Sequence, residues 1–232
     1  MRRVALFGIA AAVVSACSSD SMRTPAQPES ISVPLQVGLP QHNGTRHNHS
    51  VHLSGDQEPT PTPPAPSPQD SEAQGQAIFK IAEDELSFDY KLIAANIDNA
   101  VQGHIHCGPK GMNGGIFIWL FPSVTSTSAL TGPTGRHDGV LAEGTVVSGA
   151  ALNVRPVAAS AVCPGGVANF ADALRQIRSG NAYVNIHTND GVAPTNTGPG
   201  DFPGGEIRGQ IRRLGKVRSS APSTAPNPIL GY

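Results

Sequence analysis

The sequence lacks an excess of either charge, and this makes several kinds of partner unfavourable. Its 232 residues include 16 basic and 17 acidic side chains, so no net charge draws the chain toward nucleic acid or an acidic membrane surface. Aromatic residues make up only 5% of the sequence, and few of them are interleaved with basic residues as in nucleic-acid-binding motifs. Nucleic acid is therefore not expected as a partner.

Sequence signatures of common enzymes are also missing. No glycine-rich phosphate loop opens a helix, and neither G-x-S-x-G nor H-E-x-x-H occurs, so the usual signatures of nucleotide binding, serine hydrolysis and zinc proteolysis are absent. Glycine (26 residues) and proline (21 residues) are instead abundant, as expected for a turn-rich β protein with irregular segments. We therefore predict a protein that is not an enzyme.

Cysteine is scarce as well, and the first of the three residues ends a predicted export signal. Arg2 and Arg3 precede the apolar run Val4–Val14, which is too short to span a bilayer. The segment Val14–Cys17, with the sequence VSAC, resembles the lipobox of bacterial lipoproteins. We expect residues 1–17 to be a lipoprotein signal peptide, with Cys17 acylated and the protein anchored in the cell envelope by its lipid. Ordinary cleavage near the same position is the alternative.

The other two cysteines, Cys107 and Cys163, remain as a pair. An even remainder in an exported protein predicts one disulfide between them. Two buried free thiols are the alternative.

One domain is predicted between two irregular ends. Residues 18–48 are polar, contain proline and glycine, and show no sustained period, which predicts a disordered tether. Residues 215–232 are predicted to be a disordered tail. Four histidines lie in or just beyond the tether: His42, His47, His49 and His52. Such a tract could bind transition metals loosely, or it could be a solvated linker that happens to contain histidines.

Within the predicted domain, residues 49–214, apolar and polar residues alternate as in half-buried antiparallel strands. The clearest hairpin joins a strand at Ala77–Ile81 to a return strand that places Leu86, Phe88, Tyr90 and Leu92 on one face. The wholly apolar run Ile116–Phe121 predicts a central strand. The pattern favours an antiparallel β-sandwich or a barrel-like domain.

One short helix is predicted before the last strands. Asn169 can cap its start, and Gly180 can end it. Between them, four apolar residues form a stripe with helical spacing: Phe170, Ala173, Leu174 and Ile177.

Three short motifs have a recognisable order and spacing. Val51–Pro59 has the sequence VHLSGDQEP, Gly103–Gly115 has GHIHCGPKGMNGG, and the closing stretch contains YVNIHT followed by PGGEIRGQI. Together they resemble the CHRD domain, the repeat first described in chordin and also found in bacterial exported proteins. In chordin the repeats belong to an extracellular protein that binds growth factors. The resemblance therefore implies a binding or structural module with a protein partner, although it does not identify that partner.

Histidines occur in two of these motifs. His104 and His106 lie two apart on a predicted strand and project from the same face, while His187 belongs to another strand that could lie beside it. Three imidazoles are suitable ligands for zinc or copper, and copper–zinc superoxide dismutase also has His-x-His on a strand of a β-sandwich. A metal-binding protein or metal-dependent oxidoreductase is thus the competing hypothesis. In the structural alternative, the imidazoles hydrogen-bond to carbonyls, Asn185 or Glu206 and hold the glycine-rich loop Cys107–Gly115.

The closing motif contains further polar residues that are predicted to be structural. Tyr183 and Asn185 share one strand face with His187, and Glu206 and Arg208 share one face of the next strand. Glu206 and Arg208 could form an ion pair, because opposite charges on one strand face can reach each other.

Overall fold

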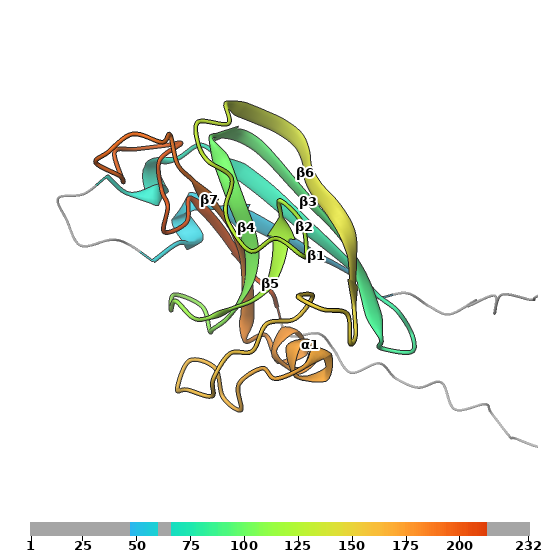
Figure 1. The fold of residues 1–232 in the computed structure, drawn as a ribbon. Helices are drawn as coiled ribbons and strands as arrows, with labels where there is room; N and C mark the ends of the chain where they lie inside the picture. Colours follow the sequence, from blue (N-terminus) through green and yellow to red (C-terminus); the bar gives the residue numbers. More distant parts are fainter. Residues whose placement is uncertain (1–46, 60–65, 213–232) are drawn as a thin grey trace, which may run out of the picture. The chain divides into compact units, whose positions relative to one another are not determined.

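The computed structural model describes residues 47–59 and 66–212, and its strands form one antiparallel sheet (Figure 1). The strands are β1 (His47–Ser54), β2 (Gln74–Ile81), β3 (Ser87–Asp98), β4 (Ala100–Cys107), β5 (Ile116–Phe121), β6 (Arg136–Val147), β7 (Ala182–Thr188) and β8 (Ile207–Gln210). The predicted signal peptide, Cys17, most of the tether and the predicted tail lie outside the described residues.

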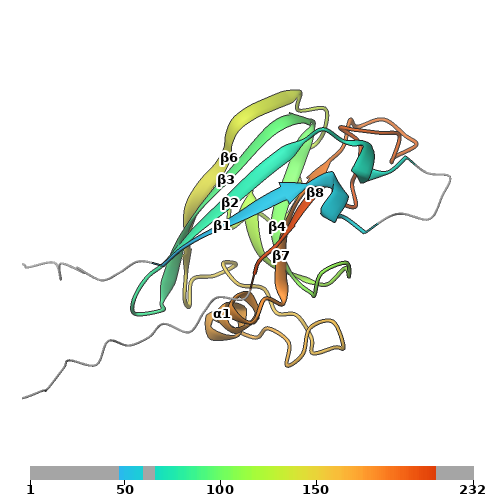
Figure 2. The same cartoon turned by 180° about the vertical axis from the view of Figure 1, so that it is seen from behind.

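The sheet has the order β5-β4-β7-β8-β1-β2-β3-β6 and curls into a nearly closed barrel (Figures 1 and 2). The strands at the two ends of this order, β5 and β6, approach each other. Tyr90 of β3 donates its hydroxyl hydrogen to the carbonyl of Leu120 in β5 at 2.7 Å. Because burial raises the pKa of Tyr90 to about 12, this phenol remains a donor across the gap. The predicted antiparallel, barrel-like fold is therefore confirmed.

The alternating pattern places one face of each strand in a common core. Phe88, Tyr90 and Leu92 of β3 are buried as predicted. Leu86, however, is 57% exposed, so its predicted place on the buried face is wrong. The reason is local: β3 begins at Ser87, and the backbone N–H of Leu86 donates to the Asp84 carboxylate within the preceding turn.

The helix α1 (Phe170–Ser179) lies at one end of the barrel (Figure 1). Asn169 caps it by accepting the backbone N–H of Asp172 at 3.1 Å, and Gly180 ends it in the left-handed conformation. The predicted apolar stripe is buried, and the Phe170 ring stacks on Phe88 of the sheet with centroids 5.9 Å apart. Among residues 47–59 and 66–212, no helix combines the length and the apolar character that crossing a bilayer requires.

The disulfide between Cys107 and Cys163 is present, as predicted, with the two Cα atoms 5.4 Å apart. Both cysteines are fully buried. The bond joins the end of β4 to the irregular chain that precedes α1. Asn181 strengthens the same junction, because its side-chain amide donates to the carbonyl of Val162 at 3.1 Å.

Candidate functional site

The two faces of strands β4, β7 and β8 have different chemistry. One face contributes fully buried apolar side chains such as Ile105, Val184 and Ile186 to the core. The opposite face has six polar or aromatic side chains, here called the polar layer: His104, His106, Tyr183, Asn185, His187 and Arg208. The strand register pairs His104 with Asn185, and Asn185 with Arg208, and paired residues project from the same face. The central and closing motifs therefore meet in space.

The polar layer is almost completely covered, since none of its six residues is more than 7% exposed. Two glycines explain how the backbone of the covering loops can approach so closely. A Cβ atom on Gly114 would lie 1.7 Å from the carbonyl oxygen of Cys107. A Cβ atom on Gly205, whose φ is +126°, would lie 2.4 Å from a Glu58 carboxylate oxygen. Only glycine can occupy such positions without displacing its neighbours.

Arg208 fixes the glycine-rich loop by hydrogen bonds to three of its oxygen atoms. Its guanidinium donates to the carbonyls of Pro109 and Met112 at 3.1 and 2.9 Å, and to the side-chain oxygen of Asn113 at 3.2 Å. It also lies over the ring of Tyr183, with 3.2 Å between the guanidinium carbon and the ring centroid. The planar fork of arginine suits such a site, because it can reach several fixed acceptors at once.

Glu206 has a different set of partners, and the Glu206–Arg208 ion pair does not occur among the described residues. Glu206 lies one residue before β8 (Ile207–Gln210), outside the regular strand, although its backbone N–H still donates to the carbonyl of Ile186. Its carboxylate accepts hydrogen bonds from the hydroxyls of Ser71 and Thr188 at 2.5 and 2.6 Å, and from the backbone N–H of Gly200 at 2.9 Å. Glu206 thus fixes the loop between β7 and β8.

Glu58 is a buried carboxyl group to which sequence reasoning assigned no role. It follows the short 3-10 helix η1 (Gly55–Gln57) and is 6% exposed. The side-chain amide of Asn185 donates to its carboxylate at 3.4 Å. Burial raises the pKa of Glu58 to about 7, although the positive charge of Arg208 opposes this shift. The one sequence signal for this residue is its place as the final acidic residue of the opening motif.

The structure brings His104, His106 and His187 together. One ring nitrogen from each lies within 4.8 Å of the others, and Nδ1 of His104 is 3.3 Å from Nε2 of His187. The single tryptophan, Trp119 of β5, packs against the His104 ring with centroids 4.3 Å apart. Chiefly through burial, the pKa of His104 falls to about 2 and those of His106 and His187 to about 4. All three rings are therefore neutral at pH 7.

The histidine tract near the N-terminal end of the domain does not form a similar cluster within the described residues. Strand β1 begins at His47, and the side chain of His52 is exposed on it. His42 and the side chain of His47 lie outside the described residues. Among those that are described, His104, His106 and His187 form the one group of three potential metal-ligating side chains.

A family model for the CHRD domain matches residues 49–211. The chain belongs to the CHRD domain family. The match includes all three sequence motifs and the whole polar layer, so the resemblance expected from the motifs is confirmed. Neither the curated proteins nor the solved structures include a match to the chain.

In this CHRD domain the motifs share one structural task. The opening motif supplies Glu58, the central motif supplies His104, His106 and the glycine-rich loop, and the closing motif supplies the remaining polar residues with Gly205. Side chains from one motif hold the backbone of another, as Arg208 holds the loop at Pro109. The three motifs thus build a single covered polar layer.

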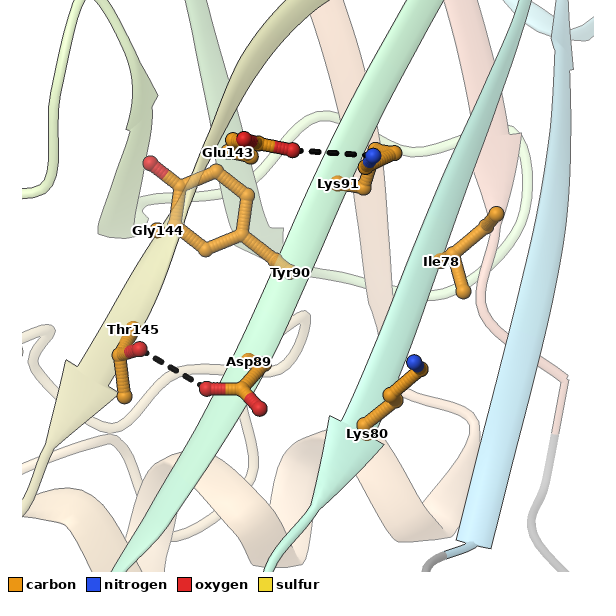
Figure 3. Close-up of a pocket in the computed structure, with 8 residues that line it drawn as sticks. All are labelled: Ile78, Lys80, Asp89, Tyr90, Lys91, Glu143, Gly144 and Thr145. Carbon is orange, nitrogen blue, oxygen red and sulfur yellow. Dashed lines mark hydrogen bonds and ion pairs between the residues drawn. The ribbon is translucent and has the colours of Figure 1, made fainter.

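A depression of about 520 Å³ on the outside of β2, β3 and β6 is a second candidate site (Figure 3). It is lined by Ile78, Lys80, Asp89, Tyr90, Lys91, Glu143, Gly144 and Thr145. Three of its charged groups already have partners: Lys91 pairs with Glu143 at 3.0 Å, and Asp89 accepts from the hydroxyl of Thr145 at 2.8 Å. The depression contains no residue of the three motifs, so the polar layer is the stronger candidate.

Proposed function

We propose that the chain is a membrane-anchored, extracytoplasmic CHRD-domain lipoprotein that acts as a binding or structural module and not as an enzyme. Membership of the CHRD family supports the binding or structural role. The observation that carries the extracytoplasmic part is the buried disulfide between Cys107 and Cys163, because such bonds form and persist in oxidising compartments. The lipobox-like segment ending at Cys17 supplies the anchor in this proposal.

The arrangement of the site also supports binding in preference to catalysis. Arg208, Tyr183 and Glu206 direct their polar atoms at the backbone or hydroxyl groups of covering loops, so these groups hold the loops in one conformation. The loop tips remain accessible: Met112 is 49% exposed and Val192 63% exposed. A loop that is ordered in advance loses less conformational entropy when a partner binds. The partner in this proposal is a protein or another component of the envelope.

Fractionation of the native host tests the anchor. The natural chain should appear in the membrane fraction and incorporate labelled fatty acid, whereas Cys17→Ser should appear in the soluble fraction without label. Ser19→Ala, two residues away, is the matched control and should behave like the natural chain. Membrane association of Cys17→Ser equal to that of the natural chain would show that Cys17 is not the anchor.

Photocrosslinking in the same membranes tests the binding role. A photoreactive amino acid at Met112 or Val192 should give a discrete crosslinked product, because both side chains project from the ordered loops. The same amino acid at Val140, which is 47% exposed on β6, is the control and should not give that product. Equal crosslinking at all three positions would contradict binding through the loops.

A further inference from the structure

In His106 and His187, hydrogen bonds to the backbone determine which ring nitrogen carries the proton. Nδ1 of His106 lies 2.9 Å from the carbonyl oxygen of Gly114, and Nδ1 of His187 lies 2.8 Å from that of Pro203. A carbonyl oxygen only accepts, so both Nδ1 atoms are donors. A neutral imidazole has a single N–H, and Nε2 of each ring therefore has a free lone pair. Metal-binding histidines commonly donate their other N–H to a carbonyl in this way.

The cluster contains more acceptors than donors. Nε2 of His187 lies 3.0 Å from the side-chain oxygen of Asn185, and this oxygen faces the histidines because the Asn185 amide group donates to Glu58. Neutral His104 has a single ring proton, so it can donate a hydrogen bond to at most one of these acceptors. Among the described residues, Nε2 of His104 and Nε2 of His106 are buried without a hydrogen-bond partner. Unsatisfied buried polar atoms of this kind cost about 1–3 kcal/mol each. A shared cation would satisfy Nε2 of His106 together with Nε2 of His187 and Nδ1 of His104, which lie 3.3 Å apart.

We propose that His104, His106 and His187 bind one transition-metal ion of the zinc or copper class and thereby tie β4 to β7 across the polar layer. Neutral imidazoles are preferred ligands of these ions, whereas calcium and magnesium prefer oxygen. The spacing is suitable: nitrogens bound 2.0–2.1 Å from a tetrahedral zinc ion are about 3.4 Å apart, and the His104 and His187 nitrogens are 3.3 Å apart.

The surroundings allow such an ion to enter and be held. His106 and His187 retain 7% and 6% exposure, while His104 is completely buried behind them. Two positive charges oppose binding of a cation, Arg208 beside His106 and Arg155 beside His104. The Glu58 carboxyl group lies on the other side of Asn185 and offers compensating negative charge when it is ionised. The site thus has three buried ligands, two of which retain slight exposure, and an acidic group nearby.

Metal titration of the purified full chain after treatment with a chelator tests the proposal. Zn²⁺ or Cu²⁺ should bind at one ion per chain and raise the melting temperature. Substituting a residue of the second shell of a metal site typically weakens binding about 10–100-fold, so loss of a ligand in His106→Gln should weaken it by about 100-fold or more. His52→Gln changes an exposed histidine on β1 in the same way and should leave binding intact.

Binding that is lost in His52→Gln but retained in His106→Gln would overturn the proposal and place the ion at the N-terminal tract. Absence of stoichiometric binding by the wild type would also overturn it. Because His106→Gln could itself disturb the loop at Gly114, the ring nitrogens of the wild type provide a second measurement. On addition of Zn²⁺, the nitrogen NMR signals of Nε2 in His106 and His187 should shift, and unchanged signals would refute the assignment.

Discussion

Replacement of Arg208 by lysine tests whether the polar layer holds the glycine-rich loop. Arg208 is 1% exposed, and its guanidinium satisfies three acceptors while it lies over Tyr183. Lysine keeps the positive charge but concentrates its donors on one atom. A single ammonium group cannot lie over the ring and also reach the carbonyls of Pro109 and Met112 together with Asn113. At least one buried acceptor should therefore lose its partner.

The expected loss follows from these contacts. Hydrogen bonds from a charged donor contribute about 1.5–3 kcal/mol each, and a desolvated cation–π contact contributes about 2 kcal/mol. Arg208→Lys should thus lower the free energy of unfolding by about 3 kcal/mol. Arg208→Met, which leaves all three acceptors unpaired, should lower it by about 5 kcal/mol, near the upper end of single-substitution effects.

Chemical denaturation measures these differences, and hydrogen exchange localises them. Arg212→Lys is the matched control, because Arg212 is exposed beyond β8, and it should change the free energy of unfolding by less than about 0.5 kcal/mol. Amides of residues 108–115 should exchange faster in Arg208→Lys than those of the distant strands β2 and β3. A stability equal to the wild type, or faster exchange spread evenly over the sheet, would refute the role assigned to Arg208.

Two further predictions concern Glu58 and the disulfide. The pKa of Glu58 rises from 4.5 to about 7 in the folded state, so the folded chain binds the proton more tightly, and the stability that this provides below pH 4.5 is lost as pH rises through 7. Glutamine cannot ionise, so Glu58→Gln should not lose this stability. The free energy of unfolding of Glu58→Gln minus that of the wild type should therefore rise by about 3 kcal/mol between pH 4.5 and pH 8. Urea unfolding at both pH values measures this difference, and an equal difference at the two values would contradict the raised pKa of Glu58. Joint replacement of Cys107 and Cys163 by serine opens a loop with a sequence separation of 56 residues and should destabilise the domain by about 4 kcal/mol in the chain-entropy model. Equal stability of the natural and substituted chains would contradict that estimate.

Features that depend on neighbouring residues were predictable from the sequence. The apolar run at Ile116–Phe121 became the strand β5, but its predicted central position was wrong, because β5 lies at one end of the sheet order. The stripe after Asn169 became α1 with its cap and its final glycine. The strand and helix periods are set by a few adjacent residues, so they can be recognised without knowledge of the tertiary contacts. The pairing of Cys107 with Cys163 was predictable for a simpler reason, because only two cysteines remained once Cys17 was assigned to the export signal.

The candidate site was only half predictable. The strand period placed His104 and His106 on one face. His104 and His187, however, are 83 positions apart in the sequence and are brought together only by the pairing of β4 with β7. The role of Glu58 was not predictable, because burial by distant loops shifts its pKa and no local pattern encodes that burial. The ion pair between Glu206 and Arg208 does not form, because Glu206 lies just before the regular strand β8 and each side chain has hydrogen-bond partners in a different loop.

The sequence by itself thus determined the family, the antiparallel strands and the helix, since short-range periodicity and short motifs encode each of them. It also determined the disulfide, because only two cysteines remained to pair. Tertiary structure alone decided that three separate motifs form one covered polar layer. It also decided which nitrogen of His106 and of His187 donates to a backbone carbonyl and which keeps its lone pair. The physical reason is that hydrogen-bond partners and burial depend on atoms that are close in space but far apart along the chain.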